Sequence, residues 1–570
     1  MEEIYKTPWE KFMGVVPMHL EYPDGTMYSV IEDIAKKYPD NVALHFMHSK
    51  ITFKELIKNI KKVAKAFQKL GLGKDDKILI AMPNCPQAIY AFYATNLIGA
   101  IAHMIHPLSA QKEIVFYIKD SKCKLVLTIN GFYKKFANAI KESSVKYFLL
   151  ADLKDALNPV MKIGYSLTTG RKIPKIPRSA DVIYWKNFLK KTRDIKLIET
   201  DKSNDDVAVV LYSGGTTGTS KGIALTNMNF NALSRQIVAT NPMFEIGDSM
   251  LAAMPLFHGF GLGVCIHSML ANGGCCLLVP RFTADSYSKL VIKSRCNFIA
   301  GVPTLFEALT RSKCMKNADL SCLKGVFSGG DSLSIELKAK FDNFLKERNS
   351  SIQIREGYGT TECVTASCLT PLTVAKEGSI GIPFPDTYYK IVKPNTEIEL
   401  PYGEEGEIIL AGPTVMKEYT NNKEETEQVL HKDEYGTIWL HTGDLGVMDE
   451  DGFIYFKGRI KRLIITSGYN VYPAQLENII EKHEAIQMSC VIGVRDAYKM
   501  HKVKAYVVLK KGYSPSNELK KEILEHCKLY VPKYAMPYDV EFRESLPTTL
   551  VGKVAYRILE EEVANNVTNN

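Results

Sequence analysis

Residues 211–222, LYSGGTTGTSKG, are the most informative stretch of this chain. They follow the apolar run VAVV and combine glycines, hydroxyl side chains and one lysine. Glycines let backbone N–H groups turn toward an anion, hydroxyls add donors, and a lysine adds a point charge. The pattern therefore predicts a buried strand that leads into a polyphosphate-binding loop. The predicted binding residues are Ser213, Gly214, Gly215, Thr216, Thr217, Gly218, Thr219 and Lys221.

Spacing excludes two other glycine-rich phosphate loops. Ser220 precedes Lys221 and Gly222 follows it, whereas a Walker loop has GxxxxGK followed by Ser or Thr. Residues 258–264, HGFGLGV, have GxGxG spacing and not the GxGxxG of a dinucleotide site. A flexible linker is also disfavoured, because linkers rarely follow a buried strand so directly.

On either side of this loop, short apolar runs alternate with helical patterns. KILIAMPN (77–84) and FIAGVPT (298–304) are examples, and each ends in a turn. This alternation favours an α/β fold with largely parallel sheets. We predict a large N-terminal region, 1–460, and a small mobile α+β C-terminal domain, 461–570. The N-terminal region is expected to contain α/β subdomains at about 1–195 and 196–380 and a small, mostly antiparallel β-rich unit at 381–460.

One uncharged stretch resembles a membrane-spanning helix. Residues 78–111 contain no Lys, Arg, Asp or Glu, and a hydropathy window would select 88–105. Thr95, Asn96 and Gly99 interrupt that window. We therefore expect a helix buried inside an α/β domain.

The composition is that of an ordinary globular protein. The chain has 570 residues, a formal charge of +9 and 12 cysteines. No nucleic-acid-binding motif is present, so no nucleic-acid partner is expected. The cysteines lack CxxC pairs or zinc spacing, which predicts reduced core thiols. The N-terminal MEEIYK is not a signal peptide, so we expect a cytoplasmic protein.

Further motifs appear in order toward the C-terminus. They are SGGDSL (328–333), YGTTE (358–362), GEIILAGPTVMKEY (406–419), TGD (442–444), GRIKRLIITSGYNVYPAQLE (458–477) and GK (552–553). With the phosphate loop, over roughly residues 28–560, they resemble the adenylate-forming superfamily of acyl-CoA synthetases, luciferases and peptide-synthetase adenylation domains. The resemblance implies activation of a carboxylic acid by ATP as an acyl-adenylate.

The resemblance also implies roles for residues around the nucleotide. Tyr358 offers an aromatic face to adenine, Thr361 a hydroxyl to the α-phosphate, and Glu362 an oxygen ligand to Mg²⁺. Asp444 is similar to the carboxylate that accepts the ribose hydroxyls, and Arg459 to its ribose and phosphate partner. The remaining nucleotide residues implied are Gly329, Gly330, Asp331, Gly359 and Thr360.

The C-terminal domain is implied to act in both half-reactions. Lys553 would stabilise the charge that builds up when the carboxylate attacks the α-phosphate. Lys461 falls at the pivot about which the domain turns, and Gly468 and Tyr469 fall in the loop that lines the coenzyme A tunnel. The sequence departs from the family pattern at Glu418, Gln475 and Thr548, with no effect assigned.

The acid is expected to carry an apolar chain. His258 would lie between the carboxylate pocket and the nucleotide, although it could also be a packed core histidine. Neighbouring residues are small or apolar and no fixed cation stands out, which favours a medium- or long-chain fatty acid. The expected substrate residues are His258, Gly259, Gly263, Gly301, Val302 and Pro303.

Residues 161–193 carry nine basic residues and one acidic residue, interleaved with aromatic and aliphatic side chains. Such a segment could rest on an anionic membrane surface, and similar insertions occur in long-chain acyl-CoA synthetases. A solvated basic loop is the alternative. The sequence predicts no oligomeric state.

The expected second step is transfer of the acyl group to coenzyme A, which makes the protein an acyl-CoA ligase, and two classes of alternative stay open. The acyl-adenylate could be passed to a separate carrier protein or oxidised with light emission. The chain could also be a non-catalytic acyl- or nucleotide-binding protein, but such a protein should have lost Glu362, Asp444 or Lys553, and all three are present.

Overall fold

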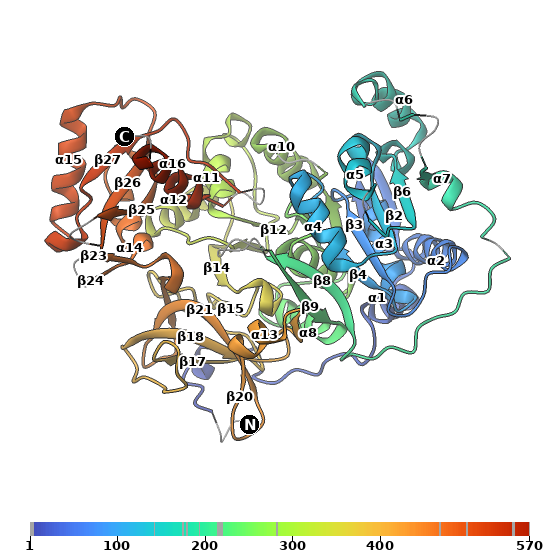
Figure 1. Cartoon of the computed structure of the whole chain (residues 1–570), viewed down its shortest axis with the longest axis horizontal. Helices are drawn as coiled ribbons and strands as arrows, with labels where there is room; N and C mark the ends of the chain where they lie inside the picture. Colours follow the sequence, from blue (N-terminus) through green and yellow to red (C-terminus); the bar gives the residue numbers. More distant parts are fainter. Residues whose placement is uncertain are drawn as a thin grey trace.

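The computed structural model describes residues 5–141, 143–173, 176–177, 181–192, 194–213, 220–280, 283–466, 469–496, 500–549 and 553–568. Two large sheets with helices, a smaller antiparallel sheet and a C-terminal α+β unit make up these residues (Figure 1). The predicted α/β class, with parallel sheets in a large N-terminal region and a smaller C-terminal unit, is confirmed.

The first large sheet has the strand order β19-β9-β8-β4-β3-β5-β6-β7. Its strands are parallel from β8 to β7, whereas β9 and β19 run antiparallel to their neighbours. Every residue of β5 is buried, as expected for a parallel strand covered on both faces. The strands are β3 (Lys77–Ala81), β4 (Ile101–Met104), β5 (Leu125–Ile129), β6 (Tyr147–Ala151), β7 (Ile183–Tyr184), β8 (Val207–Ser213), β9 (Lys221–Thr226) and β19 (Glu418–Tyr419).

The second large sheet has the order β16-β15-β14-β13-β12-β10-β11-β1-β2. Its central strands are parallel, and antiparallel strands close both edges. The strands are β1 (Val42–Phe46), β2 (Ser49–Thr52), β10 (Ser249–Ala252), β11 (Cys275–Leu278), β12 (Phe298–Gly301), β13 (Gly325–Ser328), β14 (Ile354–Tyr358), β15 (Cys368–Leu369) and β16 (Ile382–Pro383).

The chain crosses between the two sheets. Strand β1 pairs in parallel with β11, with Leu44 opposite Cys276, although the strands that follow β2 belong to the first sheet. Strands β8 and β9 in turn belong to the first sheet, beyond residue 195. The subdomain boundaries at about 195 and 380 stay a prediction.

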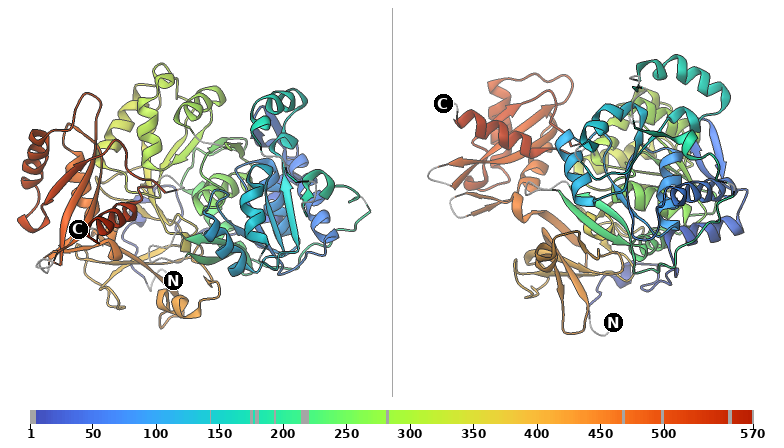
Figure 2. Two further views of the ribbon diagram at one scale, coloured as in Figure 1. Left: turned by 45° about the horizontal axis from the view of Figure 1, so that its top comes forward. Right: turned by 45° about the vertical axis from the view of Figure 1, so that its right-hand side comes forward.

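Helices cover the sheets (Figures 1 and 2). In α2, Thr52 and Glu55 form a reciprocal capping box at the N-terminus, and Phe53, Leu56 and Ile60 are buried. The main helices of this region are α1 (Met27–Lys37), α2 (Phe53–Lys69), α3 (Pro86–Leu97), α4 (Gln111–Ser121), α5 (Tyr133–Ile140), α8 (Asn227–Ala239), α10 (Ala284–Ser294), α11 (Pro303–Arg311) and α12 (Ile335–Lys346).

The uncharged stretch is a buried helix followed by a buried strand. Helix α3 ends at Leu97, Gly99 turns the chain with a φ of 73°, and β4 begins at Ile101. The expectation of a helix buried in an α/β domain is confirmed, but that helix covers only the first part of 88–105. Among the described residues, no helix is both long and apolar enough to cross a bilayer.

The β-rich unit is an antiparallel sheet with the order β17-β18-β21-β20, and β22 pairs with β21. It lies below the large sheets in Figure 1. Its strands are β17 (Tyr388–Val392), β18 (Glu405–Ala411), β20 (Leu430–Lys432), β21 (Ile438–Met448) and β22 (Ile454–Arg459), and α13 (Lys423–Val429) precedes β20.

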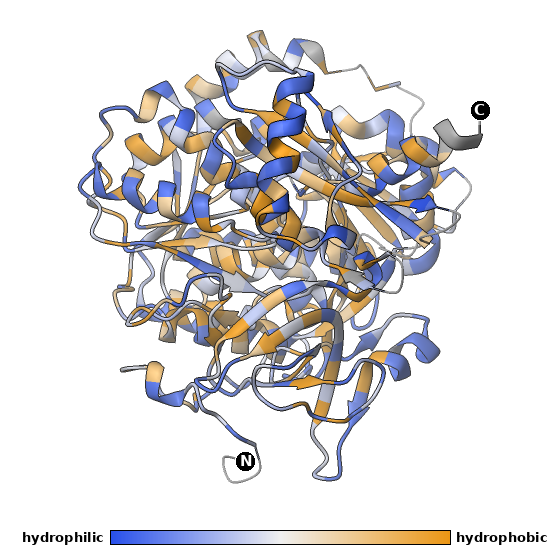
Figure 3. Ribbon diagram, turned by 90° about the vertical axis from the view of Figure 1, so that its left-hand side faces the viewer, coloured by the Kyte–Doolittle hydropathy of each residue, from blue (hydrophilic) through white to orange (hydrophobic). Residues whose placement is uncertain are grey.

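The C-terminal unit has its own core around the sheet order β24-β23-β26-β25, with β27 beside β26. Viewed from its own side in Figure 3, the nearest helix is largely hydrophilic and the strands behind it are largely hydrophobic. The elements are β23 (Ile464–Thr466), β24 (Tyr469–Val471), α14 (Pro473–Glu481), β25 (Ile486–Asp496), β26 (Met500–Leu509), α15 (Asn517–Lys528), β27 (Asp539–Phe542) and α16 (Tyr556–Thr568).

Candidate active site

A cavity of about 1370 Å³ lies where the two large sheets, the β-rich unit and the C-terminal unit meet. Side chains from all four parts line it, so its chemistry is assembled from segments far apart in the sequence. The predicted site residues that line it are Ser213, Lys221, His258, Pro303, Gly329, Gly330, Asp331, Tyr358, Gly359, Thr360, Thr361, Glu362, Asp444, Arg459, Lys461 and Lys553.

The predicted phosphate loop connects two antiparallel strands, β8 and β9. Ser213 and Lys221 are paired at the end of this hairpin that adjoins the loop. Lys221 forms an ion pair with Glu425, and its Nζ lies 4.8 Å from the ring centre of Tyr419. Gly214, Gly215, Thr216, Thr217, Gly218, Thr219 and the tunnel residue Gly468 lie outside the described residues.

The YGTTE segment ends β14 and enters a tight turn. Thr361 begins a 3₁₀ turn, and Val364 and Thr365 both have positive φ angles. A β-carbon at Gly359 would lie 2.6 Å from the backbone of Thr365, so only glycine fits there. This close backbone packing presents Thr360 and Thr361 to the cavity.

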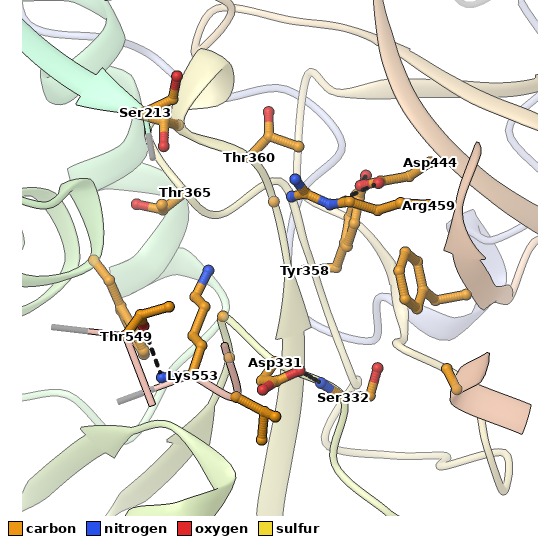
Figure 4. A pocket seen from close by; sticks show the side chains of 18 of the residues that line it. Ser213, Asp331, Ser332, Tyr358, Thr360, Thr365, Asp444, Arg459, Thr549 and Lys553 are labelled. Carbon is orange, nitrogen blue, oxygen red and sulfur yellow. Dashed lines mark hydrogen bonds and ion pairs between the residues drawn. The ribbon is translucent and has the colours of Figure 1, made fainter. Parts of the chain in front are cut away.

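Asp444 connects Tyr358 with Arg459. The Tyr358 hydroxyl donates to Asp444 Oδ2 at 2.7 Å, and Arg459 Nε lies 3.3 Å from Asp444 Oδ1 (Figure 4). Asp444 pairs with Arg459 across β21 and β22. Burial raises the pKa of Asp444, and the nearby guanidinium opposes that shift. Its Oδ1 accepts no hydrogen bond from the described residues, which leaves a buried acceptor for a ligand hydroxyl.

Glu362 is positioned by Tyr419 of β19, the edge strand of the first large sheet. The Tyr419 hydroxyl donates to Glu362 Oε1 at 2.8 Å, and the backbone N–H of Met416 donates to the Glu362 carbonyl at 2.7 Å. Mg²⁺ is commonly held by one or two carboxylates together with substrate phosphates and water. A single oriented carboxylate on the cavity wall fits that arrangement.

Lys553 points into the cavity from the C-terminal unit, toward the space between Thr365 and Asp331 (Figure 4). Thr549 Oγ1 accepts from the Lys553 backbone N–H at 3.1 Å, and the Thr549 N–H donates to the Lys553 carbonyl at 2.7 Å. Burial lowers the pKa of Lys553, while Asp331 and Asp444 favour its charged form. The ammonium therefore lies near both carboxylates, and in the described part of the chain it forms no direct ion pair with either.

One part of the cavity is apolar and adjoins His258. Burial lowers the pKa of His258 to about 3, with Lys553 contributing in the same direction, so the imidazole is neutral at physiological pH. Its Nδ1 accepts from the Phe260 N–H at 3.3 Å. The apolar lining side chains include Phe257, Phe260, Val264, Phe327, Leu369, Ile380 and Phe384.

Several predicted substrate residues pack behind the cavity and do not line it. A β-carbon at Gly263 would lie 2.9 Å from Leu233 Cδ2, and one at Gly301 would lie 2.2 Å from Leu305 Cδ2. Both glycines thus permit close packing of the wall. Gly259 and Val302 are also absent from the lining.

The predicted pivot residue lines the cavity, whereas the described tunnel residue does not. Lys461 lies in a 3₁₀ turn, Ile460–Arg462, on the cavity wall. Tyr469 is 56% exposed, does not line the cavity, and stacks on Tyr534 at 4.4 Å between ring centres.

Sequence reasoning missed residues whose role depends on tertiary contacts. Tyr419 ends the motif 406–419, but nothing in the local sequence indicates that its hydroxyl bonds Glu362. Thr365 and Phe260 also line the cavity without a motif of their own. Thr365 follows the YGTTE motif closely and Phe260 follows the predicted substrate residue Gly259, and this proximity in sequence is the signal that could have indicated them.

Comparisons with known proteins identify the family of this chain. The family model described as "AMP-binding enzyme" matches residues 31–420, and "AMP-binding enzyme C-terminal domain" matches 475–553. The chain therefore belongs to the AMP-binding enzyme family, as the resemblance of its motifs predicted.

Curated relatives align over nearly the whole chain. A long-chain-fatty-acid–CoA ligase of Bacillus subtilis is 34% identical, covering 98% of this chain and 99% of the relative. One of Salmonella typhimurium is 31% identical, covering 95% and 96%. Among solved structures, ATP-bound MatB from Rhodopseudomonas palustris has a TM-score of 0.80 at 25% identity, covering 94% of this chain and 98% of that one. An anthranilate CoA ligase in complex with anthranoyl-AMP has a TM-score of 0.82 at 21% identity, covering 98% and 99%, and shows the shared fold.

Proposed function

We propose that this protein is an AMP-forming acid–thiol ligase that converts a long-chain fatty acid, ATP and coenzyme A into acyl-CoA, AMP and pyrophosphate. The observation that carries the proposal is the single cavity that holds Tyr358, Glu362, Asp444 and Lys553 beside an apolar wall. The names of the curated relatives support the same reaction.

In the first half-reaction a carboxylate oxygen of the acid attacks the α-phosphorus of ATP. The bond to the β-phosphate oxygen breaks, and pyrophosphate leaves. Lys553 stabilises the negative charge that increases at the α-phosphate, and the Thr361 hydroxyl donates to the same oxygens. Asp444 accepts ribose hydroxyls at Oδ1, while Arg459, whose Nε lies 3.3 Å from that oxygen, holds the carboxylate in place.

Glu362 is the residue proposed to hold Mg²⁺. When bound, the ion would neutralise phosphate charge and orient the pyrophosphate. The Tyr419 hydroxyl fixes one Glu362 oxygen and thus the direction of the carboxylate.

In the second half-reaction the coenzyme A thiol attacks the acyl carbonyl, a thioester forms, and AMP leaves. Lys553 lies in the cavity and Tyr469 lies outside it, an arrangement suited to the first step. We propose that the C-terminal domain, 461–570, rotates at Lys461 to exchange Lys553 for the segment around Gly468 and Tyr469. One contact across the boundary is the Lys510–Glu336 ion pair at 3.0 Å, which this rotation would have to break.

The apolar wall supports an unsubstituted acyl chain. Phe260, Val264 and Phe327 offer hydrocarbon surface and no charge, and neutral His258 adds no fixed cation beside the chain. Burying each additional methylene contributes about 0.8 kcal/mol, so affinity is expected to rise with chain length until the pocket is full.

Identification of the acylated product tests whether coenzyme A is the acceptor of the acyl group. With ATP, Mg²⁺ and a long-chain fatty acid, mass spectrometry should detect acyl-CoA and AMP when coenzyme A is supplied. A Lys553→Ala variant should lose acyl-adenylate formation while it still transfers a supplied acyl-adenylate to coenzyme A. Acylation of a carrier protein with no acyl-CoA formed would replace the proposal with the carrier-dependent reaction.

The segment 161–193 is proposed to rest on an anionic membrane surface. Support comes from α6 (Pro159–Leu167), which projects from the body of the molecule in Figures 1 and 2. Its Val160, Ile163 and Leu167 are 79%, 65% and 54% exposed. Exposed apolar side chains beside basic residues fit an anionic bilayer, into which long-chain fatty acids also partition.

Sedimentation with vesicles tests this contact. The protein should sediment with vesicles rich in phosphatidylglycerol and less with neutral phosphatidylcholine vesicles. Ile163→Asp should reduce sedimentation, whereas Val15→Asp, which changes an exposed aliphatic side chain outside this segment, should not. Equal sedimentation of the Ile163→Asp and unmodified proteins would reject the proposed surface without affecting the ligase assignment.

A further inference from the structure

Two histidines converge on one glutamate in the β-rich unit. His441 Nε2 lies 3.0 Å from Glu397 Oε1, and His431 Nδ1 contacts the same oxygen. The potential ligand atoms of these three residues all lie within 4.8 Å of one another. The His431 and His441 ring centres are 4.4 Å apart.

The strand register places both histidines on one face of the sheet. His431 of β20 is opposite Trp439 of β21, and His441 follows Trp439 by two residues. Since alternate residues share a face, His431 and His441 are diagonal neighbours. Glu397 reaches them from the connection between β17 and β18, so three separate chain segments supply the cluster.

A second carboxylate orients the buried histidine. His441 Nδ1 lies 3.2 Å from Glu407 Oε2, so its two ring nitrogens face different glutamates. Glu407 is itself buried, and its Oε1 accepts from the Gly443 N–H at 2.9 Å. A histidine that ligates a metal usually donates its other ring N–H to a carboxylate in this way.

We propose that Glu397, His431 and His441 form a binding site for a divalent transition metal ion of the zinc class. Two imidazoles and one carboxylate are borderline ligands that suit zinc, whereas Mg²⁺ prefers oxygen ligands alone. The proposed ion would replace the direct contacts that now join the two imidazoles to Glu397, and water could complete a tetrahedral site. This site uses different residues from the oxygen-ligand position proposed at Glu362, although His431 and His441 line the same cavity.

The proposed metal site is open to solvent, and a bound ion would stabilise the strands around it. Glu397 is 57% exposed and His431 is 37% exposed, so an ion can enter from solvent, while buried His441 closes the inner side. A bound ion would join the 393–399 connection and β20 to β21. The same strand continues to Asp444, so the ion would stabilise the segment that carries this carboxylate.

Direct metal binding tests the proposal on the full-length protein. After treatment with a chelator, the protein is titrated with Zn²⁺ and, separately, with Co²⁺ in excess Mg²⁺. We expect one ion per chain by equilibrium dialysis and elemental analysis. Bound Co²⁺ should show the visible bands of a low-coordinate nitrogen and oxygen site without sulfur charge-transfer absorption.

Matched variants locate the ion. His431→Ala and Glu397→Gln should each weaken Zn²⁺ binding by roughly 10–100-fold, because each removes one ligand. His48→Asn removes an exposed histidine elsewhere and should leave the affinity unchanged. Circular dichroism checks that each variant is folded, and Glu397→Gln alters only an exposed side chain if His431→Ala proves unstable.

Three results would overturn the proposal. They are no stoichiometric Zn²⁺ binding at micromolar free ion, binding that neither variant weakens, and a Co²⁺ spectrum dominated by sulfur ligands. The first would mean that direct contacts with Glu397 are the whole interaction. The other two would assign the metal to another site.

Discussion

Lys553 lies directly over Gly330. A β-carbon built at Gly330 would be 3.3 Å from Lys553 Cε, and the Gly330 φ angle is 82°. The absence of a side chain at this position therefore lets the C-terminal lysine enter a cavity formed mainly by the N-terminal region. This contact joins the two parts of the chain at the point where the first half-reaction is proposed to occur.

Gly330→Ala should slow acyl-adenylate formation by roughly 10–100-fold, because displacing a reacting group by a fraction of an ångström is costly. Thioester formation from supplied acyl-adenylate should fall less. Gly378→Ala is the matched control, since Gly378 has a φ of 75° but its nearest neighbour would be 3.9 Å away. If both variants lose the same activity, backbone strain and not the Lys553 contact explains the effect.

The alkaline limit of adenylation should report the charge of Lys553. Burial lowers the pKa of this residue, so its positive charge is lost at a lower pH than for an exposed lysine. As the pH rises through the lowered pKa, single-turnover acyl-adenylate formation should decrease. Any activity that remains in Lys553→Arg should persist to higher pH, because a guanidinium stays charged. Identical alkaline limits in both proteins would exclude Lys553 as the titrating group.

Tyr419→Phe should raise the Mg²⁺ concentration needed for half-maximal activity about fivefold. The substitution removes one hydrogen bond to Glu362, and such a bond contributes about 1 kcal/mol. Tyr22→Phe also removes a tyrosine–carboxylate hydrogen bond, to Asp386 at 2.6 Å, outside the cavity. That control should leave the Mg²⁺ dependence unchanged, and an unchanged value in Tyr419→Phe would argue against Glu362 as the metal ligand.

Two buried histidines should make folding sensitive to acid. Burial lowers the pKa values of His103 and His267 to about 3, whereas an unfolded histidine has a pKa of about 6.5. Below about pH 6.5 the unfolded state binds more protons, so the free energy of unfolding falls as the pH decreases. Each group contributes up to about 1.4 kcal/mol per pH unit until its folded pKa is reached.

Urea unfolding at several pH values measures this dependence. His267→Gln should flatten the loss of stability between about pH 6 and about pH 4, because one proton-binding difference is removed. His48→Asn should retain the original slope, since its histidine is exposed. An unchanged slope in His267→Gln would show that this histidine binds a proton in the folded state.

The sequence allowed the class of fold to be predicted because strands such as β5 and β8 are short apolar runs bounded by turns. It did not allow the pairing of β1 with β11 to be predicted. The residues of β1 favour a strand but carry no information about a partner more than 200 positions away. Long-range parallel pairing is set by packing of the whole domain.

The residues of the candidate active site could be predicted where a side chain has a defined chemical role. Glu362, Asp444 and Lys553 fall in ordered motifs and reach the cavity together. Gly263 and Gly301 were predicted to line the acyl pocket, but the nearness of Leu233 and Leu305 shows that they serve packing. A glycine in a motif does not reveal which neighbour requires it to be small.

Pyrophosphate release tests the central claim most directly. The measurement uses ATP, Mg²⁺ and a series of straight-chain fatty acids, with and without coenzyme A. The proposed function predicts release that peaks with long-chain acids and is sustained over many turnovers only when coenzyme A is present. Absence of release with every acid, in the presence of coenzyme A and Mg²⁺, would contradict it.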